Sequence, residues 1–329
     1  MHRNHIIIID GTQSRMTTGE ETNAGILYKL LLEVHDPKTT SLHYDAGVQG
    51  HGLWNLVTLA SGMGINKSIK NAYDLLASKY RAGDRIFLFG YSRGAYAVRS
   101  LAGMIDQVGL LRRECATHRN LRQAFRLYEQ QASAATLRDF CAEHCAANVE
   151  ITMVGVWDTV KALGLPYPLI SRLAPMATEF HNDRIGACVK HGYQALAIDE
   201  NRIAYTPELW DADPSWPGQM QQVWFKGGHA DVGGQVYARP AARGLSNIPL
   251  TWILKKVVDC GLTLPDDWRQ RYPCDETAPK VGSYRGIAKF FLFRKRRVLG
   301  CKSAEFIHPS AKSRFKGDAV PIPLLSQEN

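Results

Sequence analysis

Four short apolar runs, each ending in small or polar residues, constrain the fold more than any other feature of this chain. They are Ile6–Ile9, Arg85–Phe89, Ile151–Val156 and Gln222–Phe225. None alternates apolar and polar residues as a half-exposed strand does, and this is typical of strands buried on both faces of a parallel sheet. Helical patterns lie between them, at Asn23–Val34, Lys67–Tyr80 and Gly94–Val108. The alternation predicts an α/β fold with a mostly parallel central sheet and helices on both faces.

We expect a single domain over residues 1–329, because the hydrophobic fraction of 45% can supply one large core. Two stretches fit the alternation poorly. Residues 112–148 are helical and charged, and residues 163–220 begin with a proline-rich apolar segment. We expect both to be insertions over the active-site edge of the sheet, as lids often are. The polar residues 315–329 are predicted to be a loose tail.

A serine stands at the junction between a predicted strand and a predicted helix. The sequence Gly90-Tyr91-Ser92-Arg93-Gly94 follows the apolar run and leads directly into the helical pattern. This context is typical of the nucleophile elbow of α/β-hydrolases, where a strained turn exposes the serine hydroxyl and side chains at the two glycines would collide. The sequence therefore predicts Ser92 as a nucleophile; the alternative is a packing turn in which Ser92 caps the helix.

The same turn predicts part of an oxyanion hole. The backbone N–H of Arg93 lies at the helix N-terminus, which favours the negative charge that develops on a substrate carbonyl oxygen. A second donor is expected in the loop after the first strand, at Gly11 or Thr12. The alternative for this Asp10-Gly11 segment is a plain turn.

A serine nucleophile needs a histidine base and a carboxylate that orients the imidazole. Strand ends converge on one edge of a parallel sheet, so the residues that follow the strands are the candidates. One assignment is Ser92 with Asp158 and His229, and the other is Ser92 with Asp231 and His308. The glycine-rich loop around His229 favours the first, while the second resembles the commoner hydrolase order.

Two other functions are also consistent with these residues. Asp10, Asp158, His229 and Asp231 could hold a metal ion in a metal-dependent hydrolase, since imidazole and carboxylate groups suit several divalent ions. The chain could also be a non-catalytic binding or scaffold member of the fold. Cys141 and Cys145 flank His144 but have no second ligand pair nearby. We expect neither a metal nor a cofactor.

The net charge of +9 favours partners that carry phosphate groups. The basic run Arg294–Arg297 follows the aromatic run Phe290–Phe293, and with Trp210, Trp216 and Trp224 these residues could form a surface for an anionic membrane. The alternative is a buried strand beside a solvated charge run. No nucleic-acid-binding motif accompanies the charge, so we expect no nucleic-acid partner.

Targeting signals are not evident in the sequence. The N-terminus lacks the apolar region and cleavage site of a signal peptide, and no apolar stretch is long enough to span a bilayer. We expect synthesis in the cytoplasm, so that any export depends on another route.

Eight segments carry a resemblance to a known family: Ile9–Gln13, Thr22–Asn23, Tyr44–Val48, Gly90–Tyr96, Arg99–Gly103, Val154–Val160, His191–Glu200 and Val223–Gly234. Taken together, these segments resemble the bacterial and fungal α/β-hydrolase-like domain that includes the first group of type VI secretion lipase effectors. The resemblance implies a phospholipase-type serine esterase with a Ser-Asp-His triad, favours Asp158 and His229 as partners of Ser92, and implies phospholipid substrate, an immunity protein and delivery by type VI secretion. Gln13-Ser14 departs from the tryptophan and asparagine usual after the DGT turn, and family effectors are often longer.

Overall fold

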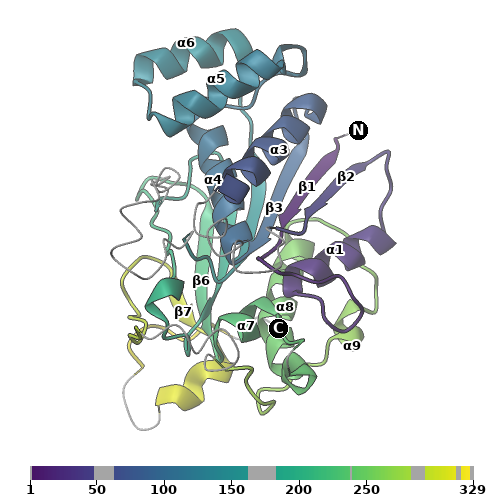
Figure 1. Cartoon of the computed structure of the whole chain (residues 1–329), viewed down its shortest axis with the longest axis vertical. Helices are drawn as coiled ribbons and strands as arrows, with labels where there is room; N and C mark the ends of the chain where they lie inside the picture. Colours follow the sequence, from purple (N-terminus) through teal and green to yellow (C-terminus); the bar gives the residue numbers. More distant parts are fainter. Residues whose placement is uncertain are drawn as a thin grey trace.

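Seven parallel strands form one sheet in the part of the chain that the structure describes (Figure 1). The computed structural model describes residues 2–47, 63–161, 183–237, 239–282, 293–315 and 320–326. The strand order across the sheet is β2-β1-β3-β4-β5-β6-β7. The strands are β1 (Asn4–Ile9), β2 (Thr40–Asp45), β3 (Arg85–Tyr91), β4 (Ile151–Trp157), β5 (Val189–Ala197), β6 (Gln219–Phe225) and β7 (Glu305–Ile307).

The predicted α/β fold with a parallel sheet is confirmed. The four apolar runs are β1, β3, β4 and β6, and their inner residues are buried on both faces. The pattern did not predict β5, although it lies inside the sheet between β4 and β6. The reason is the polar content of β5, where the buried Gln194 side chain bonds to Thr159 Oγ1 at 2.7 Å and to Gln222 on the neighbouring strand.

Helices cover both faces of the sheet. On one face α3 and α4 pack on β1, β3 and β4, and on the other α1 and α8 pack on the sheet and on each other. The α-helices are α1 (Asn23–Glu33), α3 (Met63–Lys79), α4 (Arg93–Val108), α5 (His118–Glu129), α6 (Ala134–His144), α7 (His229–Gly233), α8 (Arg243–Asp259) and α9 (Trp268–Arg271), and short 3₁₀ turns are η1 (Arg113–Cys115), η2 (Ile203–Tyr205), η3 (Pro240–Ala242) and η5 (Pro309–Phe315).

Helices α5 and α6 form a separate pair at the far end of α4 (Figure 1). Cys141 on α6 lies against the Val108 carbonyl at the end of α4, and Leu111 bridges to Cys145. Since α4 starts at the carboxyl edge of the sheet and ends at the amino edge, this pair lies away from the carboxyl edge that we expected residues 112–148 to cover. The second expected insertion, residues 163–220, is not an insertion throughout, because residues 189–197 form β5 inside the sheet. Of the rest, residues 200–209 lie at the carboxyl edge. Residues 162–182 are outside the described part.

The tail is partly tied to the last strand. The Leu325 N–H donates to the Ile307 carbonyl at 2.8 Å, and Ile307 N–H donates to Pro323 at 2.9 Å. Residues 320–326 of the expected loose tail are therefore hydrogen-bonded at the sheet edge; 316–319 and 327–329 are outside the described residues.

Of the three tryptophans expected on a membrane surface, two are buried, and the third, Trp216, is half-buried and donates its Nε1–H to the Val189 carbonyl at 3.0 Å. Trp224 is fully buried and hydrogen-bonded to Glu305, and Trp210 is buried under the Arg99 guanidinium. Of the aromatic run, Phe293 is exposed, and residues 290–292 lie outside the described part. No helix among the described residues combines the length and apolar character needed to cross a bilayer.

Candidate active site

Ser92 occupies a strained turn between β3 and α4. Its backbone has φ 59° and ψ −121°, a region that residues with a side chain rarely adopt. The flanking glycines make the turn possible. A Cβ at Gly94 would lie 2.1 Å from the Ile9 carbonyl oxygen, and a Cβ at Gly90 would lie 2.6 Å from the Gly94 backbone. The predicted strand-turn-helix context of Ser92 is therefore present, with no side-chain cap bond from Ser92 to the helix.

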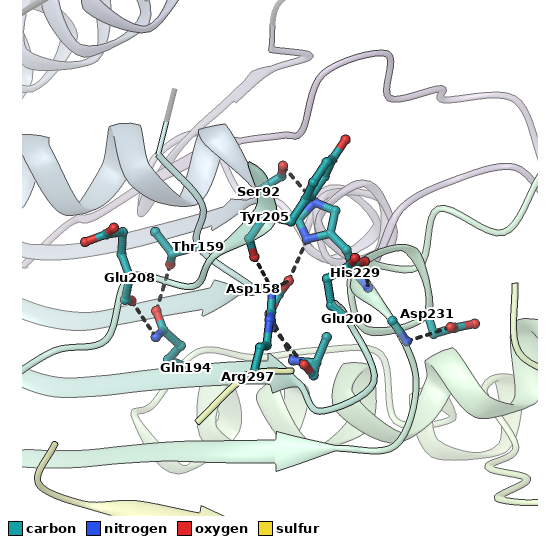
Figure 2. Close-up of polar contacts among 12 residues, drawn as sticks. Ser92, Asp158, Thr159, Gln194, Glu200, Tyr205, Glu208, His229, Asp231 and Arg297 are labelled. Carbon is teal, nitrogen blue, oxygen red and sulfur yellow. Dashed lines mark hydrogen bonds and ion pairs between the residues drawn. The ribbon is translucent and has the colours of Figure 1, made fainter. Parts of the chain in front are cut away.

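Three side chains form a continuous hydrogen-bonded series at the carboxyl ends of β3, β4 and β6 (Figure 2). The Ser92 Oγ lies 2.9 Å from His229 Nε2, and His229 Nδ1 lies 2.6 Å from Asp158 Oδ2. Asp158 follows β4 directly, and His229 opens α7 after β6. This spacing suits proton transfer from the hydroxyl to the imidazole, with the carboxylate fixing the tautomer.

Aromatic rings hold the imidazole in place. The Tyr91 ring centroid lies 4.9 Å from that of His229, and the Tyr205 ring meets it edge-on at 4.8 Å (Figure 2). Both Ser92 and His229 are almost completely buried. The packing of these rings therefore restricts the imidazole to an orientation in which it faces the Ser92 hydroxyl.

Asp158 is buried and held by a guanidinium. Arg297 contacts both carboxylate oxygens, at 2.5 and 2.9 Å, and the Ala197 N–H donates to Oδ1 at 2.9 Å. Burial raises the pKa of Asp158, but the charge of Arg297 and the hydrogen bond from His229 outweigh burial and hold it well below its ordinary value. Asp158 is therefore ionised at neutral pH.

Burial favours the neutral form of the His229 imidazole. Burial lowers its pKa below the ordinary value of 6.5, against the raising effect of Asp158. A second acid, Glu200, accepts the His229 backbone N–H at 3.2 Å and forms a two-pronged ion pair with Arg202. Burial raises the pKa of Glu200, but the contacts with Arg202 outweigh burial and lower the pKa to about 2. The loop before α7 is thus anchored by a permanently charged group.

The loop after β1 packs directly against the elbow. The buried Asp10 carboxylate accepts hydrogen bonds from the Gly11 N–H, Thr22 and Tyr44, each at 2.6 Å. Because Gly11 N–H already has this partner, Thr12 is the better-placed of the two predicted donors. The Thr12 hydroxyl is buried and has no hydrogen-bond partner among the described residues. Arg93 begins α4, so its N–H lies at the helix N-terminus, directly after Ser92.

The alternative acid and base lie elsewhere. Asp231 accepts the Gly228 N–H at 2.8 Å and the Val281 N–H at 2.7 Å, and so caps α7. His308 stacks on Phe225 and bonds through Nδ1 to the Ser310 hydroxyl at 2.9 Å. Neither contacts Ser92, and they do not contact each other. The structure therefore brings Asp158 and His229 together with Ser92. It does not bring Asp231 and His308 to Ser92.

The carboxylates considered for a metal do not converge. Asp10 and Asp231 are each saturated by protein donors, and Asp158 is held by Arg297. Among the described residues there is no group of three His, Cys, Asp or Glu side chains arranged to hold a metal ion. Cys141 and Cys145 both lie against the Val108 carbonyl at the end of α4.

Three residues at the site were missed in the sequence. Arg297 was placed in a surface charge run, yet its side chain is only 4% exposed. Glu200 follows β5, and a correct prediction of that strand would have put it on the same edge as Ser92. Tyr205 carries no local signal, because its contact with His229 joins two distant loops.

A family model and a curated relative both match part of this chain. Residues 3–256 match the family described as "T6SS, Phospholipase effector Tle1-like, catalytic domain". An uncharacterized protein of Saccharomyces cerevisiae is 29% identical over 236 residues, which cover 62% of this chain and 33% of the relative. The chain thus spans about a third of that curated relative.

Three solved structures align with part of this chain. An uncharacterized protein from Pseudomonas aeruginosa aligns with a TM-score of 0.44 and 16% identity, over 83% of this chain and 48% of its own. The Tle1 effector bound to the VgrG spike of the type 6 secretion system aligns with a TM-score of 0.39 and 16% identity, over 71% of this chain and 51% of its own. Thermogutta terrifontis esterase 2, in its apo form, has a TM-score of 0.39 and 10% identity, over 80% of this chain and 86% of its own.

Proposed function

The chain belongs to the Tle1-like catalytic-domain family of type VI secretion phospholipase effectors, and from this premise we propose that it is a serine esterase that cleaves acyl esters of membrane phospholipids. One observation carries the proposal. The Ser92 hydroxyl, the His229 imidazole and the Asp158 carboxylate are hydrogen-bonded in series at a strained elbow. The same arrangement of serine, histidine and carboxylate catalyses acyl transfer in enzymes of several unrelated folds.

In the first half of the reaction Ser92 is the nucleophile. Its Oγ attacks the ester carbonyl carbon while His229 Nε2 takes the hydroxyl proton. Asp158 accepts the hydrogen bond from Nδ1–H and stabilises the imidazolium. The tetrahedral intermediate then collapses, the C–O bond to the alcohol breaks, and Nε2 returns the proton to the leaving oxygen. The product is an acyl group on Ser92.

In the second half, water replaces the alcohol. His229 takes a proton from water, the hydroxide attacks the acyl carbon, and the bond to Ser92 Oγ breaks as the serine regains its proton. A fatty acid leaves and the enzyme is restored. The neutral state of His229, favoured by burial, supports both proton transfers at neutral pH.

Negative charge on the carbonyl oxygen needs donors that are already in place. We assign the Arg93 N–H at the start of α4 and the Thr12 backbone N–H to this role. The Thr12 hydroxyl, buried without a partner among the described residues, is a third donor at the same loop. Gly11 is assigned a supporting part, since its N–H holds the Asp10 carboxylate.

Membership of an effector family supports a wider role. We propose that the chain acts on the membrane of a target cell as an antibacterial effector, makes peripheral contact with that membrane, is delivered by a type VI secretion component and is neutralised by an immunity protein. Binding of the purified chain to a candidate spike or immunity protein tests this role separately from the chemistry.

The chemistry is tested by lipid hydrolysis with product analysis by mass spectrometry, comparing wild type with Ser92→Ala. We expect free fatty acid and lysophospholipid from wild type and a loss of about 10⁴-fold or more in kcat in the variant. A fluorophosphonate probe should label Ser92 in the folded wild-type protein. A folded protein that resists the probe and releases no fatty acid from any chain length would be a non-catalytic member of the family.

A further inference from the structure

A cavity of about 810 Å³ lies beside the triad, with no role in the reaction described above. Its walls come from α4, from residues 202–209 and from residues 295–302. Among the described lining residues, seven are Lys or Arg and two are Asp or Glu. The volume falls in the range of ordinary ligand sites, but the lining is far more cationic than such sites usually are.

Two of the lining arginines connect the cavity to the triad. Arg297 lines the cavity and also holds Asp158 (Figure 2). Arg202 lines it and stacks on the Tyr205 ring at 3.7 Å, and that ring packs on His229. Tyr96, which follows Ser92 on α4, lies on another wall. A molecule in the cavity is therefore separated from the Asp158–His229 pair by single side chains.

Some of the lining charge is already balanced. Arg297 and Arg202 pair with the buried acids Asp158 and Glu200, and Lys161 lies 3.4 Å from Glu208. Lys302 lies 3.3 Å from Asp211. These groups shape the wall and contribute little net charge.

Three further lining cations are Arg99, Lys295 and Arg296. The buried Arg99 guanidinium is held by the Gln194 amide oxygen and by the backbone carbonyls of Glu208 and Leu209. Burial lowers its pKa to about 10, which reflects the cost of a buried cation. The side chains of Lys295 and Arg296 are exposed and have neither hydrogen-bond nor ion-pair partners in the part of the chain that the structure describes. The net field in the cavity is thus positive.

We propose that this cavity binds the phosphate of a net-anionic lipid headgroup and so selects anionic phospholipids as substrates of Ser92. The proposal rests on the proposed esterase function. A phosphate oxygen accepts charge-assisted hydrogen bonds from guanidinium and ammonium groups, and these are stronger than bonds between neutral groups. A zwitterionic headgroup would bring its own ammonium against the same cations, which disfavours it.

The test compares two short-chain lipids, dihexanoyl phosphatidylglycerol and dihexanoyl phosphatidylcholine, both kept as monomers so that binding to a membrane surface plays no part. The readout is the ratio of their kcat/KM values. We expect the wild type to favour the glycerol lipid, and Lys295→Gln/Arg296→Gln to lower the ratio by about tenfold. The control, Arg119→Gln/Arg138→Gln, removes the same charge from exposed positions on α5 and α6 and should leave the ratio unchanged.

Inorganic phosphate separates recognition of phosphate itself from recognition of the whole headgroup. If phosphate alone suffices, it should inhibit cleavage of the glycerol lipid competitively in the wild type and several-fold more weakly in Lys295→Gln/Arg296→Gln. If phosphate does not inhibit while the ratio still falls in that variant, the site reads the intact headgroup. A wild-type ratio near one, or an equal fall in the control variant, overturns the proposal.

Failure of this proposal is distinct from failure of the esterase function. Hydrolysis of p-nitrophenyl butyrate, a neutral ester without a headgroup, reports the triad alone. If that ester is cleaved and the ratio of kcat/KM for the two lipids is near one, only the proposed headgroup site is contradicted. If no ester is cleaved, calorimetric titration of monomeric dihexanoyl phosphatidylglycerol into the wild type and into Lys295→Gln/Arg296→Gln still tests the cavity, and equal heats or none count against it.

Discussion

The Arg297 guanidinium donates hydrogen bonds to both oxygens of the Asp158 carboxylate, the same carboxylate that hydrogen-bonds to His229. Both side chains are buried, so neither charge can be hydrated if the other is removed. The pair connects a segment near the end of the chain to the centre of the site, and its loss would leave a buried carboxylate with one fewer partner.

We therefore expect Arg297→Met to lower the free energy of unfolding by about 3–5 kcal/mol, as is usual when one partner of a buried ion pair is removed. Urea unfolding followed by tryptophan fluorescence measures this. Arg296→Met, which removes an exposed neighbouring cation, should stay within about 0.5 kcal/mol of wild type. Equal stability of the two variants would mean that the Arg297–Asp158 contact contributes nothing to the fold.

Substitutions of the two candidate bases, His229 and His308, are expected to have different effects on kcat. His229→Gln should lower kcat on a neutral ester by about 10⁴-fold or more, because His229 Nε2 is the nitrogen hydrogen-bonded to the Ser92 hydroxyl among the described residues. His308→Gln should keep kcat within about threefold, since His308 bonds to Ser310 and not to Ser92. Both rates are measured below the unfolding temperature of each variant, whose folded fraction is checked by circular dichroism. A loss of kcat confined to His308→Gln would transfer the role of base to that residue.

The pH dependence follows from the burial of His229. A protonated imidazole cannot accept the Ser92 proton, so activity falls as the pH drops through the pKa of His229. Because burial lowers that pKa, we expect the acid midpoint of kcat/KM for a neutral soluble ester to lie below pH 6.5. Initial rates between pH 4.5 and 8, at constant ionic strength, locate the midpoint. A midpoint above about pH 7 would contradict the neutral-base assignment.

The Thr12 side chain tests the oxyanion assignment. Thr12→Val keeps the shape of the side chain and removes the buried hydroxyl that has no partner among the described residues. We expect kcat to fall by about 10²-fold with little change in KM, as for the loss of one oxyanion donor, while stability holds or rises slightly. Thr12→Ser retains the hydroxyl and should retain most of the activity. If Thr12→Val has wild-type kcat, the hydroxyl is not a donor.

The elbow glycine tests the packing of the turn. A Cβ on Gly94 would lie 2.1 Å from the Ile9 carbonyl oxygen, and the backbone cannot move away without opening the sheet. We expect Gly94→Ala to lower the free energy of unfolding by about 3 kcal/mol or more. In Gly228→Ala the new Cβ would meet Glu200 at an ordinary 3.6 Å, so stability should change by less than about 1 kcal/mol. Chemical denaturation of the two variants side by side decides the matter.

Local patterns in the chain were sufficient for much of the fold. The apolar runs of β1, β3, β4 and β6 and the helices between them follow from short-range periodicity, and so does the elbow at Ser92, because a strand, two glycines and a helix are adjacent in sequence. The rule that parallel strands end at one edge was enough to bring Asp158 and His229 forward as candidates. It left two pairs of acid and base open, since Asp231 and His308 also follow strands.

Only the tertiary structure separated those pairs and completed the site. Asp231 caps α7 and Arg297 turns inward to Asp158, although its neighbours Lys295 and Arg296 face solvent. The physical reason is that a charge run has no periodicity that marks one member for burial; which arginine is buried depends on where a distant carboxylate lacks a partner. Contacts of that kind are long-range, so they are decided by the packing of the whole sheet and not by any segment alone.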